Sequence, residues 1–464
     1  MEAPTISKGW FANEDTAALP QYSSDQSQSI ATTSIFARGS SVRRVWSRVY
    51  LKASRSQVVD AGPAPDGGVK AWTQVGMAFA TCLTAWGFVN SFGVFQTYYT
   101  DTMSETQSTI SWIGSVQVWV IFAVGMFSGR ALDAGLFTPT FLLGSALQML
   151  GVFTTSVCKN FWQLLLAQGF CTGLGCGIIF CPVMGIVTTY FERNRAFAVA
   201  IVSTGNSIGG ILYPILVRSL LPKIGFAWTV RVLGFVNLTC LAAAAMFLSP
   251  RLPPRKGDPI IEWRMFLNIP YTCMVIGMAL VFGGVFFTLY FLGSYGRNIL
   301  GMSYAESTNL VLLFNAAGLP ARLLTGWVVD RLTGPMNGMI PLLLLNSICT
   351  FAWIGVTSKA SYYALVAIYG LPAGAFQCLF PTTLTCINRD PKKNGIMLGM
   401  AFWVLSFSGL AGPPIGGALL QTNGGGRGGY VSALVASGFA SFVGTCLMIV
   451  ARVYQEGLDL RKKC

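Results

Sequence analysis

The chain has 464 residues, of which 53% are hydrophobic and only 10% are charged, with 31 Lys and Arg, 17 Asp and Glu and no histidine. Soluble domains carry about 25% charged residues, so lipid is the expected solvent for so much apolar surface. The lack of histidine excludes His-based catalysis, His metal sites and His proton relays, and we expect no metal, no cofactor and no enzyme activity. The net charge of +14 does not indicate nucleic acid as a partner, because the basic residues cluster in short loops between apolar runs.

Residues 1–65 are rich in Ser, Thr, Gln, Ala and Pro, which is typical of disorder, and we expect a disordered cytoplasmic tail over 1–69. One stretch differs, SSVRRVWSRVYLKASRS. Its Val and Trp residues recur at helical spacing, and its Arg and Lys residues lie on another face. This pattern predicts either a short amphipathic helix on an anionic leaflet or a solvated basic linker, and the sequence leaves both open.

From residue 71 onward, apolar runs of about 20 residues follow one another, and each is long enough to cross a bilayer as a helix. The linker SPRLPPRKGDPIIEWR (249–264) interrupts the pattern with four prolines and divides the runs six and six. We therefore predict an all-α integral membrane protein with an N-terminal six-helix bundle (70–249), a cytoplasmic linker (250–269), a second six-helix bundle (270–454) and a cytoplasmic tail (455–464). The twelve expected spans lie near 71–95, 112–130, 138–157, 162–189, 196–220, 228–249, 270–294, 304–328, 338–357, 361–387, 395–420 and 430–453.

The distribution of positive charge predicts the orientation. An even number of spans places both termini on one side, and Lys and Arg concentrate in cytoplasmic loops. Of the 31 basic residues, 23 fall in the tails, the linker and the loops on the same side as the termini, and one, Arg322, falls within a span. Both termini are therefore expected in the cytoplasm. The seven basic residues on the opposite side are Lys159, Arg218, Lys223, Arg231, Arg297, Lys359 and Arg427.

Two weak motifs repeat at one offset of 197 residues. Gly129-x-x-x-Asp133 recurs as Gly326-x-x-x-Asp330, and Gly173-Leu174-x-x-Gly177 recurs as Gly370-Leu371-x-x-Gly374. Paired motifs at a single offset indicate a duplicated six-helix unit.

The repeated Gly-x-x-x-Asp resembles the loop signature of the major facilitator superfamily, between its second and third and its eighth and ninth helices. PDGGVKAW (65–72) resembles the Asp-Gly-Gly-x-x-x-Trp signature of the monocarboxylate porter family, and AWGFVNSFGVFQTYY (85–99) continues it. YFERNRAFAVAIVSTGNSIGG (190–210) and GPPIGGALL (412–420) resemble that family's fourth-to-fifth helix junction and eleventh helix. The resemblance covers 65 to about 455 and is strongest to the fungal branch. It implies the major facilitator fold and transport of a small organic solute.

This chain departs from the family's proton-coupled lactate carriers at two charged positions. Those carriers have a Lys in the first helix, where this chain has Asn90 before Ser91. They also have an Asp one turn before the Arg of the eighth helix, and here Arg322 is preceded by Gly318. We therefore expect efflux of a secondary metabolite rather than lactate-type import. Uptake of a monocarboxylate or vitamin-like solute and a non-transporting sensor on the same scaffold remain alternatives.

Candidate solute-binding residues are the polar and aromatic groups inside the spans. A charge within a span is expensive, so Arg322 is expected to face a cavity, where its planar fork of donors suits a carboxylate or enolate. The alternative is that Arg322 reaches the cytoplasmic end or pairs with Asp330. Neutral polar groups either face solute or bond neighbouring helices, and aromatic rings either stack a planar solute or pack. These candidates are Asn90, Gln117, Asn206, Asn315, Gln377, Tyr290 and Trp403.

The repeated Gly-x-x-x-Asp predicts a cytoplasmic gate. Asp133 and Asp330 are expected to act as latches, each accepting bonds from a neighbouring helix N-terminus or a loop Arg. Arg195 and Arg331 are the candidate Arg partners, and Gly129 and Gly326 would let the adjacent backbone come close. The expected partners of the protein are a small organic solute that is anionic or planar, membrane lipid, and protons as a possible coupling ion. The expected location is the plasma membrane, or alternatively a vacuolar or other internal membrane.

Overall fold

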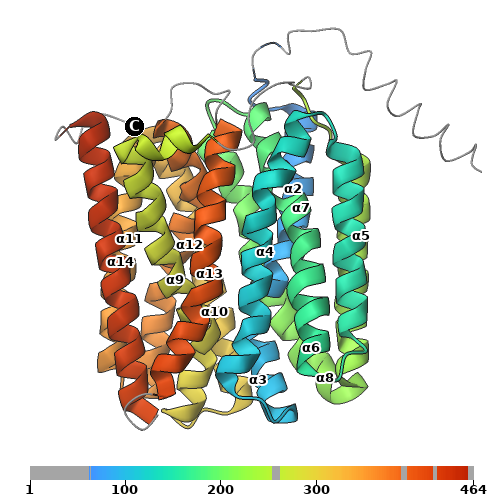
Figure 1. Ribbon diagram of the computed structural model, residues 1–464, viewed down its shortest axis with the longest axis vertical. Helices are drawn as coiled ribbons and strands as arrows, with labels where there is room; N and C mark the ends of the chain where they lie inside the picture. The colour runs from blue at the N-terminus through green and yellow to red at the C-terminus, as the bar shows by residue number, and fades with distance from the viewer. Residues whose placement is uncertain (1–61, 63, 253–261, 388–393, 422–425, 458–464) are drawn as a thin grey trace, which may run out of the picture. The chain divides into compact units, whose positions relative to one another are not determined.

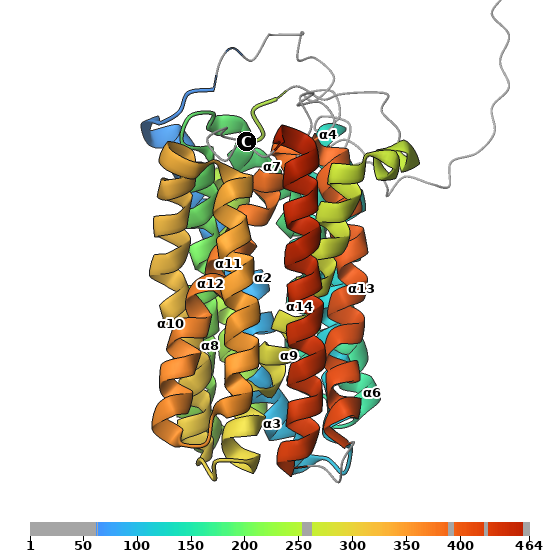
Figure 2. The same ribbon diagram turned by 90° about the vertical axis from the view of Figure 1, so that its left-hand side faces the viewer.

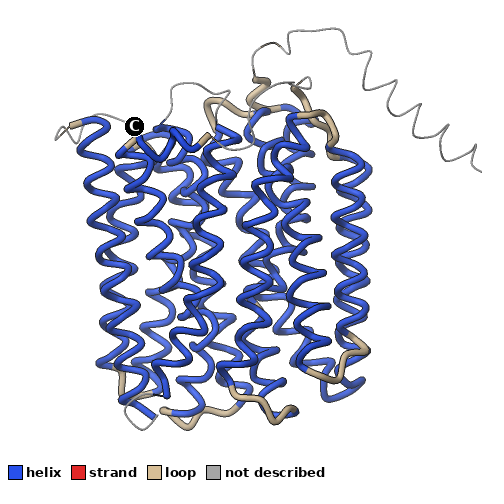
Figure 3. The backbone as a smooth tube through the Cα atoms, in the orientation of Figure 1, coloured by secondary structure: helices blue, strands red, loops and turns tan. Residues whose placement is uncertain are grey.

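The computed structural model describes residues 62, 64–252, 262–387, 394–421 and 426–457. They belong to one unit that begins at Gln57. The predicted amphipathic stretch and nearly all of the predicted N-terminal tail lie outside the described residues. Within the described ranges every regular element is a helix, as Figure 3 shows.

Six spans make up the first half of the described chain. The helix α2 and the short helix α3 together form the first span, and α6, the π-helix η1 and α7 together form the fourth. The elements are α2 (Gly68–Asn90), α3 (Phe92–Thr102), α4 (Gln107–Asp133), α5 (Phe137–Thr155), α6 (Phe161–Leu164), η1 (Leu165–Thr172), α7 (Gly173–Tyr190) and α8 (Arg195–Phe247).

The helix α8 contains two spans. Its 53 residues would extend about 80 Å as one straight helix, whereas a bilayer core is about 30 Å thick. At Gly225 the backbone leaves the helical region, with φ 72° and ψ 173°, and the chain turns back. Eleven helices in the described part are long and apolar enough to cross a membrane, and the turn at Gly225 divides one of them. The prediction of twelve crossings is therefore confirmed.

The second half of the chain forms six more spans after a short 3-10 helix in the linker. The π-helix η3 continues the eighth span and carries Asp330. The elements are η2 (Trp263–Leu267), α9 (Ile269–Asn298), α10 (Tyr304–Val328), η3 (Val329–Thr333), α11 (Pro335–Ala352), η4 (Trp353–Gly355), α12 (Lys359–Ile387), α13 (Asn394–Gln421) and α14 (Gly426–Glu456).

The repeated glycines make equivalent contacts in the two halves. Gly177 of α7 packs against Ile121 of α4, where an added Cβ would lie 2.7 Å from the Ile121 carbonyl oxygen. Gly374 of α12 packs against Gly318 of α10, where an added Cβ would lie 2.7 Å from the Gly318 Cα. Small residues at such crossings let two membrane helices approach closely. The fourth span thus packs on the second as the tenth packs on the eighth, which supports the duplicated unit.

Helices of both halves meet along two long seams. The helix α4 lies against α13, and the first span of α8 lies against α10. The start of α2 and the end of α14 lie at the same end of the helices in Figure 1, and Figure 2 shows the same arrangement from the side. We call this end the tail face and the opposite end the far face.

Candidate functional site

A cavity lies between the two bundles, about halfway along the spans. Its volume is about 30 Å³, which is room for one or two water molecules. Helices of both halves line it, so a relative movement of the bundles would change its size. The lining residues are Cys82, Trp86, Phe122, Phe180, Met184, Ser203, Asn206, Phe282, Gln377, Phe380, Pro381 and Phe402.

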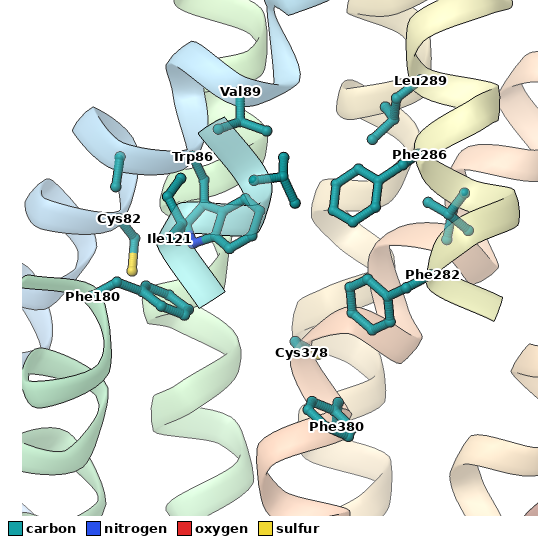
Figure 4. Packing of buried hydrophobic residues seen from close by; sticks show 14 of the residues in the cluster. Cys82, Trp86, Val89, Ile121, Phe180, Phe282, Phe286, Leu289, Cys378 and Phe380 are labelled. Carbon is teal, nitrogen blue, oxygen red and sulfur yellow. The ribbon is translucent and has the colours of Figure 1, made fainter. Parts of the chain in front are cut away.

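Aromatic residues make up half of the residues that line the cavity. In Figure 4, Trp86 and Phe180 of the first half face Phe282 and Phe380 of the second half across the space. The rings also contact one another. The centroids of Trp86 and Phe180 are 5.3 Å apart, and Phe122 stacks on Phe402 at 5.2 Å. Such a wall suits a flat, apolar solute, because ring faces and edges offer large area with little conformational freedom.

Polar groups also line the cavity, and two of them bond Arg322, which lies behind them. Its guanidinium donates from Nη1 to the Ser203 carbonyl oxygen at 3.1 Å and from Nη2 to Oε1 of Gln377 at 3.4 Å. The side chain is buried, and its Nε–H has no partner in the protein. None of the described carboxylates lies within ion-pair distance of this guanidinium. A positive charge bonded only to neutral acceptors therefore lies behind Ser203 and Gln377.

The three asparagines of the candidate set connect helices, and one of them also reaches the cavity. Asn90 donates to the Asn206 carbonyl oxygen at 3.1 Å, which links α2 to α8. Asn315 donates to the Gly210 carbonyl oxygen at 3.5 Å, which links α10 to α8 across the bundle interface. Asn206 lines the cavity, and its Oδ1 has no partner in the protein. Of the seven uncharged candidates, the structure thus brings Asn206 and Gln377 to the cavity wall.

The remaining candidates lie away from the cavity. Gln117 is fully buried in α4 beside Gly173 of α7, and neither polar atom of its side chain has a protein partner. Tyr290 packs on Phe92 at 5.0 Å between ring centroids, nearer the far face. Trp403 contacts Trp263 of the linker at 6.5 Å, and its neighbour Phe402 lines the cavity instead.

Sequence reasoning missed the aromatic wall. Periodicity separates apolar from polar faces of a helix, but in lipid a cavity wall and a lipid-facing surface are both apolar. Trp86, Phe122 and Phe180 therefore carry no signal that distinguishes them from exposed rings such as Trp162. Only polar residues of the cavity, Asn206 and Gln377, could be picked out from the sequence.

Asp330 joins the two bundles at the tail face. Its Oδ2 accepts from the Phe197 backbone N–H at 2.9 Å, and its Oδ1 accepts from the Ala196 N–H at 3.3 Å. These are among the first N–H groups of α8, which have no partner within the helix, and the residue before the helix, Asn194, makes no side-chain cap. A carboxylate of one bundle thus caps a helix of the other, where the helix dipole favours negative charge.

The Arg partners proposed from the sequence are not the groups that Asp330 bonds. Arg195 makes no ion pair with Asp330, and the guanidinium of Arg331 lies over the ring of Trp327 at 5.1 Å. Asp330 instead bonds the other partner considered, a helix N-terminus, here that of α8. The N–H groups of a helix are fixed in position, whereas a long Arg side chain is not. Asp133 ends α4, and its side chain lies outside the described part.

The two gate glycines differ. A Cβ added at Gly326 would lie 2.6 Å from the Ala200 Cβ, so α10 and α8 touch backbone to backbone there, as expected. A Cβ added at Gly129 would meet nothing within 4 Å, so the expected close approach at this glycine is wrong. Of the two glycines of the repeated Gly-x-x-x-Asp motif, Gly326 therefore lies at a close helix contact and Gly129 does not.

The bundles also touch at the far face. Asp101 of α3 forms an ion pair with Arg297 of α9, with 3.5 Å between Oδ2 and Nη1. Arg218 of α8 donates to Oδ1 of Asn309 in α10 at 2.8 Å. Together with Asp330, these contacts hold the two halves together on both sides of the central cavity.

Comparison with known proteins assigns the arrangement to a family. The model of the Major Facilitator Superfamily matches residues 77–410. A protein of Gibberella zeae described as an MFS-type transporter is 37% identical over 87% of this chain and 91% of its own length. The aspyridones efflux protein apdF of Emericella nidulans is 32% identical over 87% of this chain and 82% of its own length.

A solved structure shares the fold at low sequence identity. The human organic anion transporter MFSD10 (TETRAN) superimposes with a TM-score of 0.67, covering 82% of this chain and 99% of that chain, at 15% identity. At this identity the likeness concerns the arrangement of the helices.

Proposed function

The chain belongs to the Major Facilitator Superfamily, and from this premise we propose that it exports a small organic solute, a secondary metabolite, by alternating access. Relatives over most of the chain are MFS-type transporters, and one is named as an aspyridones efflux protein. The two six-helix bundles, 70–249 and 270–454, are the proposed rocking units, with the linker 250–269 between them. We propose that both termini lie in the cytoplasm, in line with the excess of Lys and Arg in the loops of the tail face. The proposed location is the plasma membrane, with a vacuolar or other internal membrane as the alternative.

The observation that carries the proposal is the composition of the cavity between the bundles. Aromatic rings of both halves face one another across the cavity (Figure 4), and Ser203 and Gln377, which also line it, bond a buried guanidinium that lies behind them. A flat solute with one acidic group suits both features, because its ring would stack on the aromatic wall and its anion would reach Arg322. The cavity is too small for such a solute as it stands, so binding requires the bundles to separate first.

We propose transport of the monocarboxylate-porter type, with a solute that is larger and flatter than lactate. This fits the two positions, Asn90 and Gly318, at which the chain differs from the proton-coupled lactate carriers of that family. At position 318 an added Cβ would lie 3.1 Å from the Gly370 carbonyl oxygen and 3.4 Å from the Gly374 Cα, so a side chain there would require α10 and α12 to move slightly apart. Asn90 is used to bond α8. Gly318 and Asn90 thus both take part in helix packing. Uptake of a monocarboxylate or vitamin-like solute remains the alternative, with the same residues facing the solute.

The unpaired charge of Arg322 favours exchange over net flux. A charge within a span costs about 2.5–3.5 kcal/mol, and a bound anion would offset part of this cost. The loaded protein would therefore pass through the closed state more readily than the empty one. Among the described residues no Asp or Glu is buried within the spans, so proton coupling would have to use an acid at one of the faces.

Counterflow in proteoliposomes tests the proposed function. Vesicles loaded with an unlabelled aromatic carboxylic acid should accumulate the labelled acid from outside above its equilibrium level. The Arg322→Ala protein should show no such accumulation at an equal amount of reconstituted protein. Absence of counterflow with all of a panel of aromatic and aliphatic acids and neutral ring compounds would contradict transport and favour a sensor.

A further inference from the structure

The turn between α7 and α8 presents backbone N–H groups to two carboxylates from different parts of the chain. Asp66, which precedes the first span, accepts with its Oδ1 from the N–H groups of Glu192 at 2.6 Å and Arg193 at 2.9 Å. Asp330 of the other bundle accepts from Ala196 and Phe197 a few residues later. One carboxylate thus binds the turn itself, and the other caps the helix that starts from it.

The backbone of Asp66 is held in an uncommon conformation. Its φ of 50° makes it the one described non-glycine residue in the left-handed region, which asparagine and aspartate tolerate better than most residues. Its N–H also donates to the Tyr190 carbonyl oxygen at 3.1 Å. Three hydrogen bonds to consecutive parts of one turn offset the strain of this conformation and hold the turn to the segment before α2.

Other contacts attach the same turn to the N-terminal bundle. Arg251, after α8, donates to the Thr189 carbonyl oxygen at 2.8 Å and to that of Gly62 at 2.6 Å. The rings of Trp72 in α2 and Phe191 in the turn are 5.2 Å apart. The partners of Asp66 thus all lie in one half of the molecule, whereas Asp330 lies in the other. When the bundles separate at the tail face, the bonds of Asp330 must break and those of Asp66 need not.

We propose that Asp66 is a positioning residue for the latch of the tail face: it keeps the α7–α8 turn in the shape in which α8 presents Ala196 and Phe197 to Asp330. Without Asp66 the α7–α8 turn relaxes, and the N–H groups of Ala196 and Phe197 no longer point at the Asp330 carboxylate. The tail face then opens more often. This role deepens the alternating-access function proposed above and rests on it.

Cys82 provides a reporter already present in the chain. It lines the cavity with 1% of its surface exposed, so a thiol reagent reaches it only when the bundles separate. In inside-out vesicles, a charged methanethiosulfonate reagent added at the tail face should modify Cys82 about five-fold faster in Asp66→Ala than in the wild type, the change expected from loss of one helix-capping interaction. Mass spectrometry of the peptide measures the rate. Cys176, fully buried in α7, should stay unmodified and reports an intact fold.

Two further variants make the assignment specific. Glu192 lies in the same turn and bonds Asp66 through its backbone N–H. Glu192→Gln removes a carboxylate from the turn but keeps this bond, so it should leave the rate of Cys82 modification unchanged. Asp66→Asn keeps one acceptor oxygen and tolerates the left-handed backbone, so it should restore much of the wild-type rate. Asp330→Ala should raise the Cys82 rate by itself.

The double variant Asp66→Ala/Asp330→Ala decides whether Asp66 acts through the latch. If it does, Asp66→Ala adds no further increase once Asp330 is gone. Equal fold-increases in both backgrounds, or an unchanged Cys82 rate in Asp66→Ala, would overturn the proposal. Since the measurement needs no solute, its outcome is independent of whether counterflow is found.

Discussion

Under the proposed function, Arg322 serves solute binding at the expense of stability. Its guanidinium is buried and bonded to two neutral oxygens, and its Nε–H has no protein partner. A buried charge without a counter-charge destabilises a fold, and an apolar residue of similar volume in its place is often neutral or stabilising. The residue is therefore expected to be retained for its bound partner rather than for the fold.

Arg322→Met should accordingly move stability and transport in opposite directions. We expect an unchanged or higher melting temperature in detergent, because the unpaired charge is gone. We also expect the apparent affinity for an acidic solute to fall about 10- to 100-fold, the effect of losing a charged hydrogen bond of about 1.5–3 kcal/mol. Thermal unfolding and counterflow of the same preparation measure both.

Arg322→Lys is the matched control for geometry. It keeps the charge and loses the planar fork, so it should bind the acid more weakly than the wild type and better than Arg322→Met. Equal counterflow by all three proteins would remove Arg322 from the solute site.

At the scale of elements, the proposed mechanism assigns control of the tail face to the seam between α10 and the first span of α8. Gly326 brings the two backbones together one turn before Asp330 caps α8. The cap needs this separation, because the bonds of 2.9 and 3.3 Å would be lost if the helices moved apart and their donors are held in a helix. Close packing and the latch are therefore parts of one contact.

Gly326→Ala should open the tail face, and Gly129→Ala should not. The added methyl at Gly326 would lie 2.6 Å from the Ala200 Cβ and 3.1 Å from the Ala196 carbonyl oxygen, so the helices must move apart. At Gly129 the methyl enters open space, and alanine favours a helix over glycine by about 1 kcal/mol. We expect faster modification of Cys82 from the tail face in Gly326→Ala only. The same rate in both variants would mean that the seam does not control access.

At the scale of the whole molecule, the two halves differ in what they supply to the cavity. The first half supplies Ser203 and Asn206 from α8 as well as three rings, and the second supplies Gln377, which bonds the buried Arg322 behind it, as well as three more rings. A solute that touches both polar sets can bind fully only when the halves are close. This coupling between binding and closure is what alternating access requires.

For the whole molecule, the proposed function predicts that exchange of one solute molecule for another is obligatory or preferred over net transport. Efflux of labelled acid from proteoliposomes should be at least about ten-fold faster with the same acid outside than without it, since a loaded cavity avoids carrying the unpaired charge of Arg322 through closure. The Arg322→Met protein should lose this acceleration together with its preference for acids. Efflux that is equally fast into acid-free buffer would show that the empty protein reorients freely.

Much of the architecture follows from the sequence alone. Runs of about 20 apolar residues, few charges and the repeats at one offset were enough for twelve spans in two halves, because a membrane leaves the backbone little choice other than helix. Hydropathy also predicts the boundary between the fifth and sixth spans, although the two form one continuous element, α8. The boundary is at Gly225, where a glycine with positive φ turns the chain back. Arg322 and Asp330 were likewise recognisable, since a charge in or beside an apolar run needs a reason.

The cavity itself was decided by the tertiary structure. For Asn90, Asn315, Gln117, Tyr290 and Trp403 the sequence leaves solute contact and packing both open, and the structure places them against other protein groups. The rings of Trp86, Phe122 and Phe402 are indistinguishable from lipid-facing rings until both halves are placed together. Composition and periodicity report which solvent a segment prefers, and that preference is the same for lipid and for an apolar partner. Which apolar face meets the solute therefore depends on how the bundles meet, and no local pattern encodes it.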